Sequence, residues 1–142
     1  MEAIELMIKI LLVEDSKFLR MATERALARA GYEVSSASDG DEGLRMVREK
    51  LPDLILLDML LPKMSGPDVL KALKKDPKTK GIPVVVLSGL SQKNAVRLGE
   101  DGASAFLEKG DLALDQGSEK LVAALQQILE RLTGGQAQST TA

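Results

Sequence analysis

Four short apolar runs in this chain each end on polar side chains. The clearest run covers residues 54–57 and is followed directly by Asp58. A run so short and so apolar is typical of a strand buried on both faces of a parallel sheet. Asp58 is then expected at the rim of the sheet, because burying a lone charge is costly. The other runs end in the same way: residues 8–13 on Glu14 and Asp15, residues 84–87 on Ser88, and residues 105–108 on Lys109.

Amphipathic segments alternate with these runs and predict five helices. A polar capping residue precedes four of them, and glycine or proline lies near several of the predicted ends. A further strand candidate covers residues 32–37. The predicted helices cover residues 16–30, 39–50, 65–75, 91–99 and 118–132, with Ser16, Asp39, Ser65 and Ser91 as the candidate caps.

This strict alternation predicts an α/β fold, a doubly wound parallel sheet of five strands with five helices on its two faces. The flavodoxin-like strand order 2-1-3-4-5 makes the first and third strands neighbours, and ligands bind at the carboxyl rim of such sheets. One domain is predicted over residues 8–132, after an N-terminal extension of residues 1–7. Residues 133–142 are rich in Gly, Ser, Thr and Gln and are predicted to be a disordered tail.

Composition removes several classes of function. The 142 residues include neither cysteine nor histidine, which excludes disulfides, thiolate or imidazole metal sites and Ser–His catalysis. The net charge is −2 with both signs interspersed, which gives no electrostatic case for nucleic-acid binding. No apolar run approaches the roughly 20 residues of a membrane helix, and the N-terminus lacks the basic start of a signal peptide. A cytoplasmic protein without a membrane or nucleic-acid partner is therefore predicted.

Three carboxylates are expected close together at the carboxyl rim. In the predicted strand order, Asp58 lies about one strand spacing, ~4.8 Å, from Glu14 and Asp15. Carboxylates at this separation repel one another, so either one keeps its proton at a raised pKa or a cation binds between them. Oxygen ligands of this kind suit Mg²⁺, whose remaining coordination positions can hold a phosphate.

Two further groups complete the predicted site. Ser88 would lie one strand from Asp58, and Lys109 two strands away, ~10 Å, which a lysine side chain can largely span. A carboxylate nucleophile, a metal, a hydroxyl and a fixed cation together suit phosphoryl transfer through an acyl phosphate. Taken singly, each residue has an ordinary explanation as a helix cap, a turn residue or a solvated lysine, so the inference depends on their joint placement.

At this point the chain resembles a known family. Over residues 8–132 it is similar to the receiver domain of two-component response regulators, of the stand-alone, chemotaxis-regulator type. The resemblance implies that Asp58 accepts a phosphoryl group from a phosphohistidine on a sensor histidine kinase or phosphotransfer protein. The matching motifs are Leu12-Val13-Glu14-Asp15-Ser16, Asp58-x-x-x-Pro62-x-x-x-Gly66, Leu87-Ser88-Gly89 and Phe106-x-x-Lys109.

The resemblance also implies roles for individual residues. Mg²⁺ would be held by Asp15, by Asp58, by the backbone carbonyl of Leu60 and, through water, by Glu14. Catalytic contacts to the phosphoryl oxygens would come from Ser88 and Lys109, and Ser88 would act with Phe106 as the conformational switch. A downstream protein would bind the face formed by the fourth helix (residues 91–99), the last strand and the closing helix. The chain would be a phosphoacceptor regulator rather than an enzyme, with at most Mg-dependent self-phosphorylation and slow self-dephosphorylation.

Three departures from the family pattern stand out. Gly110 replaces the usual proline after the conserved lysine, so a trans peptide bond is expected there, because a cis bond before a non-proline residue costs about 2.5–4 kcal/mol. The connection over residues 111–118 is longer than usual. Leu60 and Leu90 replace residues that are often polar, and they offer no hydrogen bond to a hydrolytic water. We therefore expect a long-lived phosphorylated state.

Other functions remain open at the level of sequence. The departures at Gly110 and in the last loop suggest a phosphorylation-independent protein-interaction module, a pseudo-receiver, on the same fold. A phosphatase with an aspartyl nucleophile is disfavoured, because Leu60 takes the place of its usual second acid. The Gly-rich segment after residue 133 also suggests a linker to an output domain.

Overall fold

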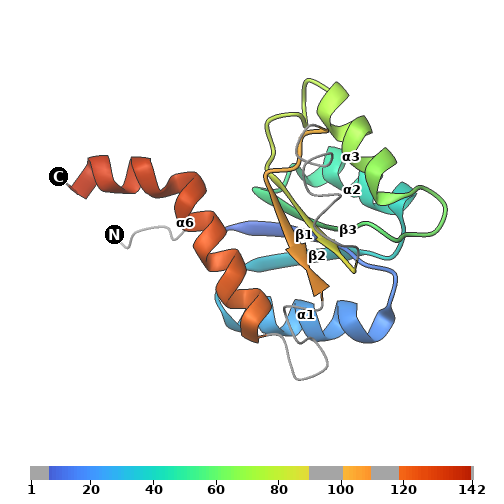
Figure 1. The fold of residues 1–142 in the computed structure, drawn as a ribbon, viewed down its shortest axis with the longest axis horizontal. Helices are drawn as coiled ribbons and strands as arrows, with labels where there is room; N and C mark the ends of the chain where they lie inside the picture. Colours follow the sequence, from blue (N-terminus) through green and yellow to red (C-terminus); the bar gives the residue numbers. More distant parts are fainter. Residues whose placement is uncertain (1–6, 90–100, 110–118, 142) are drawn as a thin grey trace.

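Five parallel strands form one sheet in the order β2-β1-β3-β4-β5 (Figure 1). This order and the α/β class confirm the prediction from the sequence. The computed structural model describes residues 7–89, 101–109 and 119–141, with side chains as far as residue 132. The strands are β1 (Lys9–Val13), β2 (Glu33–Ala37), β3 (Leu54–Asp58), β4 (Val84–Ser88) and β5 (Ala105–Glu108).

Four helices lie within the described residues, against five predicted. They are α1 (Lys17–Arg29), α2 (Gly40–Lys50), α3 (Gly66–Lys75) and α6 (Glu119–Thr141). The predicted helix over residues 91–99 lies outside the described part of the chain.

The predicted caps begin the first three helices. Ser16 accepts a hydrogen bond from the N–H of Leu19 at 3.3 Å, and Ser65 accepts one from Asp68 at 3.3 Å. Asp39 accepts from the N–H of Glu42 at 2.8 Å, while the Glu42 carboxylate accepts in return from the N–H of Ser38. Each side-chain oxygen satisfies an N–H group that has no partner inside its helix. Local polar residues thus fix where these helices start.

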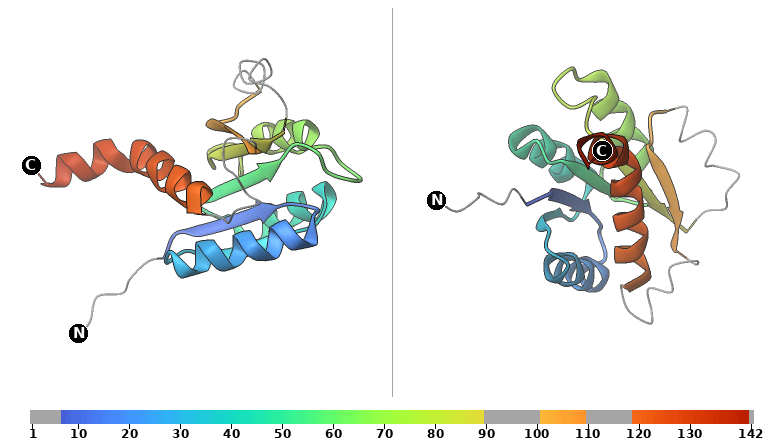
Figure 2. Two further views of the ribbon diagram at one scale, coloured as in Figure 1. Left: turned by 60° about the horizontal axis from the view of Figure 1, so that its bottom comes forward. Right: turned by 90° about the vertical axis from the view of Figure 1, so that its left-hand side faces the viewer.

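The sheet is buried on both faces. Alternate residues of β1 point to opposite sides, so Leu11 packs toward α2 and α3 while Leu12 packs toward α1 and α6. The views in Figure 2 show these helices covering the two faces. All five residues of β3 and of β4 are buried. This burial explains why these two strands read as continuous apolar runs in the sequence.

The closing helix differs from the prediction. The sequence predicts an end near Leu132, whereas α6 continues to Thr141 and its last part extends away from the sheet (Figures 1 and 2). The disorder expected for residues 133–142 stays a prediction. Gly134 and Gly135 weaken a helix, yet neither removes a backbone donor as proline would, so the hydrogen-bonded backbone continues through them. Neither α6 nor the other described helices are long and apolar enough to cross a membrane.

Candidate functional site

The carboxyl ends of β1 and β3 bring the three predicted carboxylates together. Asp58 is the last residue of β3, and Glu14 follows β1 directly; each is only 2% exposed, whereas Asp15 is exposed. One carboxylate oxygen from each residue lies within 4.8 Å of the others. The parallel register explains this, because Val13 is paired with Leu57, one residue before Asp58.

Lys109 reaches this cluster from the far side of β4. Its ammonium nitrogen lies 3.1 Å from Asp58 Oδ2 and 3.4 Å from Glu14 Oε1. Burial lowers the pKa of Lys109, but the charges of Asp58 and Glu14 outweigh this effect and hold the pKa above its ordinary value. The side chain therefore stays charged and covers the strand-to-strand distance expected from the sequence.

Backbone groups fix the two buried carboxylates. The N–H of Ser16 donates to Glu14 Oε2 at 3.1 Å, and the N–H of Leu60 donates to Asp58 Oδ1 at 3.2 Å. The N–H of Met59 donates to the carbonyl of Leu87 at 3.1 Å, which ties the loop after β3 to β4. Asp58 Oδ1 is therefore held by the loop, while its Oδ2 faces Lys109.

Two positioning contacts at this rim were not predicted from the sequence. The Arg20 guanidinium donates to the backbone carbonyl of Glu14 at 2.9 Å and to that of Asp15 at 3.4 Å. Gly66 lies so close to the end of β3 that an added Cβ would meet the backbone oxygen of Asp58 at 2.6 Å. The Gly66 position was visible as part of the Asp58 motif, whereas one arginine in an amphipathic helix gives no signal of its own.

The carboxylates remain crowded despite Lys109. Burial raises the pKa of Glu14 to about 7, and the neighbouring charge of Asp58 adds to the shift; the N–H of Ser16 and the charge of Lys109 oppose it. Glu14 therefore resists ionisation mainly because it is buried, and the nearby Asp58 charge makes its ionised form still less favourable.

This donor set suits a divalent cation. The ligands on offer are all oxygens, two buried carboxylates and one exposed one, and no described histidine or cysteine competes. Hard oxygen ligands of this kind are those that Mg²⁺ prefers, and the exposed side at Asp15 leaves room for water or phosphate ligands. The cluster thus fits the Mg²⁺ expected from the sequence.

The other predicted site residues surround the cluster. Ser88 is fully buried at the end of β4, next to Leu87, which is paired with Asp58. The Leu60 side chain is 65% exposed in the loop after β3. Phe106 on β5 is partly buried against the core beneath α2 and α3. Leu90, Gly110 and residues 111–118 lie outside the described residues, so the expected trans bond at Gly110 stays a prediction.

Comparison with known proteins agrees with this geometry. Residues 10–132 match the family model described as the response regulator receiver domain. The chain is 40% identical over 128 residues to a gliding motility regulatory protein of Myxococcus xanthus, covering 89% of this chain and 15% of that protein. It is 43% identical over 102 residues to the response regulator PleD of Caulobacter vibrioides, covering 71% of this chain and 22% of PleD. The chain thus spans less than a quarter of these relatives.

Solved structures of similar size share the fold. The chemotaxis response regulator CheY4 of Vibrio cholerae matches with a TM-score of 0.78 and 31% identity, covering 87% of this chain and 99% of CheY4. A CheY-like receiver domain protein of Methanospirillum hungatei matches with a TM-score of 0.77 and 27% identity, covering 89% and 96% of the two chains. The chain therefore belongs to the family of response regulator receiver domains, whose members act in two-component signalling.

Proposed function

We propose that this receiver domain is a switch that is turned on by phosphorylation of Asp58. Receiver domains interact with histidine kinases or phosphotransfer proteins, and the phosphoryl donor here would be a phosphohistidine on such a partner. One observation carries the proposal: Asp58 is almost fully buried, yet its Oδ2 faces a fixed ammonium group at 3.1 Å. A purely structural rim acid has no need of such an arrangement.

The proposed step forms a mixed anhydride. An oxygen of the Asp58 carboxylate attacks the phosphorus, the phosphorus–nitrogen bond of the donor breaks, and the leaving imidazole keeps the electron pair and is protonated. The Leu60 N–H holds Oδ1, which leaves Oδ2 to react. Lys109 exchanges its contact with the carboxylate for one with a phosphoryl oxygen, and Ser88 donates to another. Positioning and charge neutralisation of this kind account for most of the catalysis in phosphoryl transfer.

Mg²⁺ would be held by Asp15 and Asp58, by the carbonyl of Leu60 and, through water, by Glu14. When bound, it neutralises charge on the phosphoryl oxygens and on the carboxylate that receives them. The protein contributes the fixed positions of these oxygens. Arg20 supports this arrangement because it binds the backbone carbonyls of Glu14 and Asp15.

The signal would leave the domain through a change at β4 and β5. In this proposal the phosphoryl group draws Ser88 toward it, and Phe106 moves further into the core to fill the space. Phe106 is paired with Val86 on β4 and is only partly buried, so an inward move would bury more of its side chain. Two packings of similar energy would be biased by one new hydrogen bond. A downstream protein would read the change on the face formed by residues 91–99, β5 and α6.

Treatment with acetyl phosphate and Mg²⁺ tests the proposal. Intact mass spectrometry is expected to show the gain of one phosphoryl group, which is lost in Asp58→Asn and kept in the matched control Asp41→Asn on the surface of α2. Chelation of the metal is expected to abolish the gain. No gain in the wild type, or an equal gain in Asp58→Asn, would favour the phosphorylation-independent module.

A further inference from the structure

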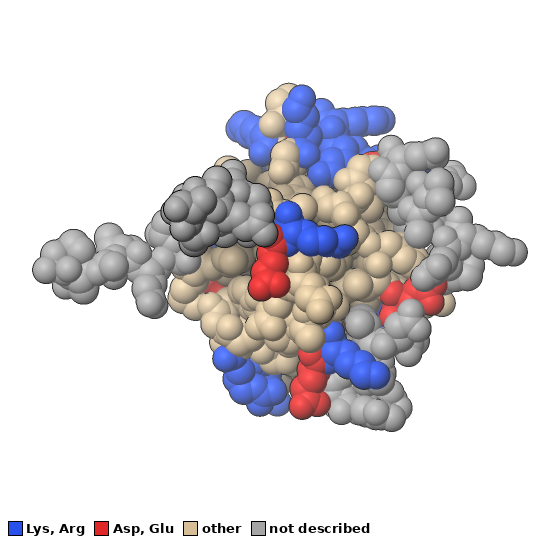
Figure 3. Space-filling model, turned by 60° about the vertical axis from the view of Figure 1, so that its left-hand side comes forward, with Lys and Arg blue, Asp and Glu red and all other residues tan. Residues whose placement is uncertain are grey.

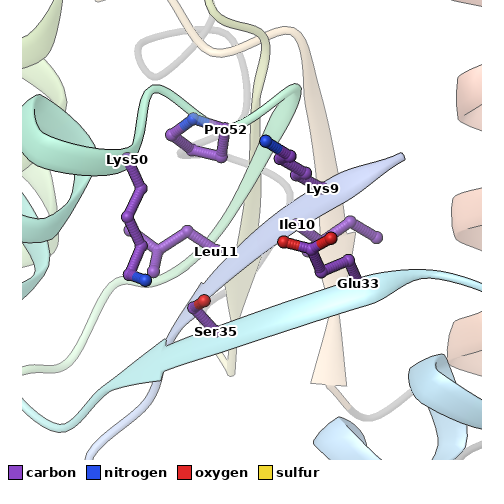
Figure 4. A pocket seen from close by; sticks show the side chains of 7 residues that line it. All are labelled: Lys9, Ile10, Leu11, Glu33, Ser35, Lys50 and Pro52. Carbon is purple, nitrogen blue, oxygen red and sulfur yellow. The ribbon is translucent and has the colours of Figure 1, made fainter. Parts of the chain in front are cut away.

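A small cavity lies at the rim of the sheet opposite Asp58. It has a volume of about 190 Å³ and opens where α2 ends above β1 and β2. Leu11 and Pro52 form apolar walls, and the polar groups around them are Lys9, Ser35 and Lys50, with Glu33 at one side (Figure 4). The sheet is uncovered here because α2 stops at Lys50.

Acidic groups also border this cavity: Glu33 lines it, and the Asp53 carboxylate accepts a hydrogen bond from the backbone N–H of Lys9 at 2.8 Å. Among the residues that the structure describes, no carboxylate lies within ion-pair distance of the ammonium group of Lys9 or Lys50. In Figure 4, Lys50 extends along Leu11 toward Ser35, and Lys9 lies beside Pro52. Two positive charges and a hydroxyl next to apolar walls suit an anionic group on an aliphatic stem.

A second group of basic side chains lies at the end of α3. Arg48, two residues before Lys50, forms an ion pair with Asp76 at 3.3 Å, which joins the end of α2 to the loop after α3. Figure 3 shows lysine and arginine side chains gathered at the top of the molecule over α3 and this loop. Four exposed lysines there have no ion-pair partner in the described part of the chain: Lys71, Lys75, Lys78 and Lys80.

The loop after α3 is built to hold one conformation. The buried hydroxyl of Thr79 donates to the carbonyl of Leu73 at 2.7 Å, and the N–H of Lys80 donates to the carbonyl of Asp76 at 2.8 Å. Lys74 turns inward and donates to the carbonyls of Lys80 and Ile82 at 3.0 and 2.8 Å. The outward lysines are therefore presented on a fixed scaffold, which reduces the entropy that a partner must overcome on binding.

We propose that this surface, from Lys9 and Lys50 to Lys78 and Lys80, docks an acidic polypeptide segment of a partner protein. One carboxylate side chain of the segment would enter the cavity between Lys9 and Lys50, and further carboxylates would lie along α3. The surface is at the opposite rim from Asp58, so such a partner can stay bound while a phosphodonor reaches the carboxyl rim. Charge complementarity of this kind gives fast, salt-dependent association.

The details favour a polypeptide over nucleic acid or a lipid surface. Glu33 borders the cavity and would repel a uniform polyanion, whereas a peptide can place a neutral or basic residue there. Single-stranded nucleic acids are usually held by stacking on aromatic rings, and no aromatic residue lines the cavity or lies between Lys71 and Lys80. The apolar walls at Leu11 and Pro52 suit the methylene groups of an acidic side chain.

Fluorescence anisotropy with a labelled short peptide rich in Glu and Leu tests the proposal on the full chain. The wild type is expected to bind it in low salt, and the same peptide with Gln in place of Glu is expected not to bind. The double variant Lys50→Glu/Lys78→Glu should weaken binding at least tenfold. The matched variant Arg25→Glu/Arg29→Glu makes the same charge change on α1 and should stay within about twofold.

Other results would overturn the docking surface. Equal weakening in both double variants would mean only a net-charge effect, and tighter binding of duplex DNA or of phosphatidylserine vesicles would identify a different anion. The outcome is separable from phosphorylation, because Asp58→Asn is expected to bind the peptide normally. Conversely, Lys50→Glu/Lys78→Glu is expected to gain the phosphoryl group from acetyl phosphate as the wild type does.

Discussion

The ammonium nitrogen of Lys109 lies 3.1 Å from Asp58 and 3.4 Å from Glu14, so one cation bridges two buried carboxylates at the carboxyl ends of β3 and β1. One positive charge cannot neutralise both acids and the neighbouring Asp15. The pKa of Glu14 rises to about 7, mainly through burial and further through the charge of Asp58. The metal-free site is thus held in an electrostatically unfavourable state, with consequences for stability and metal binding.

Glu14 should make the metal-free protein less stable as the pH rises. Its folded pKa of about 7 lies above the ordinary value of 4.5, so the folded state binds more protons between these values and loses stability as the pH rises through them. The full loss is about 3 kcal/mol. Asp58, Asp15 and Lys109 face the same group and shape the transition. Urea unfolding in EDTA should show Glu14→Gln more stable than the wild type at pH 8, with little difference at pH 4.

A surface variant controls for charge removal in general. Glu49→Gln removes an exposed carboxylate whose ion pair with Arg45, at 3.4 Å, contributes little to stability. Its unfolding free energy should follow that of the wild type at both pH values. If Glu14→Gln and the wild type lost stability in parallel from pH 4 to pH 8, Glu14 would not be the strained group.

Replacing Lys109 should tighten the binding of Mg²⁺ in the absence of phosphate. In Lys109→Met the carboxylates lose their only described cationic partner, so a divalent ion meets more uncompensated negative charge. Isothermal titration calorimetry is expected to show affinity higher by about tenfold or more. Lys75→Met, at the opposite rim, should leave the affinity unchanged. Unchanged affinity in Lys109→Met would mean that the ammonium group and the metal do not compete for these oxygens.

The sequence predicted that the site residues lie together, because a parallel sheet brings the carboxyl ends of its strands to one rim. The runs that end at Glu14, Asp58 and Lys109 are parallel strands, and the carboxyl ends of parallel strands share one rim. The strand order 2-1-3-4-5 was taken from the flavodoxin-like fold, because alternation alone is compatible with other doubly wound orders. The pattern of apolar positions therefore predicted the α/β class, and the flavodoxin-like strand order predicted which site residues lie close together.

The individual side-chain contacts of the site could not be predicted from the pattern of apolar positions. Periodicity gives no information about which carbonyls the Arg20 guanidinium binds, or that Lys109 pairs with Glu14 as well as with Asp58. The length of α6 was also misjudged, because the glycine-rich composition after Leu132 suggested a break that backbone hydrogen bonding does not require. These features depend on side-chain directions and on hydrogen bonds in three dimensions.

Gly66 should be intolerant of substitution although it begins a helix. An added Cβ would meet the Asp58 carbonyl oxygen and the Met59 Cα, both at 2.6 Å, and backbone atoms cannot move aside as a flexible side chain can. Gly66→Ala is expected to lower the free energy of unfolding by about 2 kcal/mol. It should also slow phosphorylation by displacing the end of β3. Gly81→Ala is the matched control, since a Cβ there has no neighbour within 4 Å. Equal stability of the two variants would contradict the close approach.

The phosphorylated state should be long-lived because Leu60 offers hydrolytic water no hydrogen bond. Its side chain is 65% exposed two residues after Asp58, on the open side of the site, while its N–H already holds Asp58 Oδ1. A half-life of hours rather than seconds is expected for the wild type. Leu60→Asn supplies a polar group that can orient a water, and one hydrogen bond in the transition state should shorten the half-life by about tenfold. Decay of the phosphoryl mass after removal of acetyl phosphate measures both. A wild-type half-life near a minute, or an equal rate in Leu60→Asn, would place control of hydrolysis elsewhere.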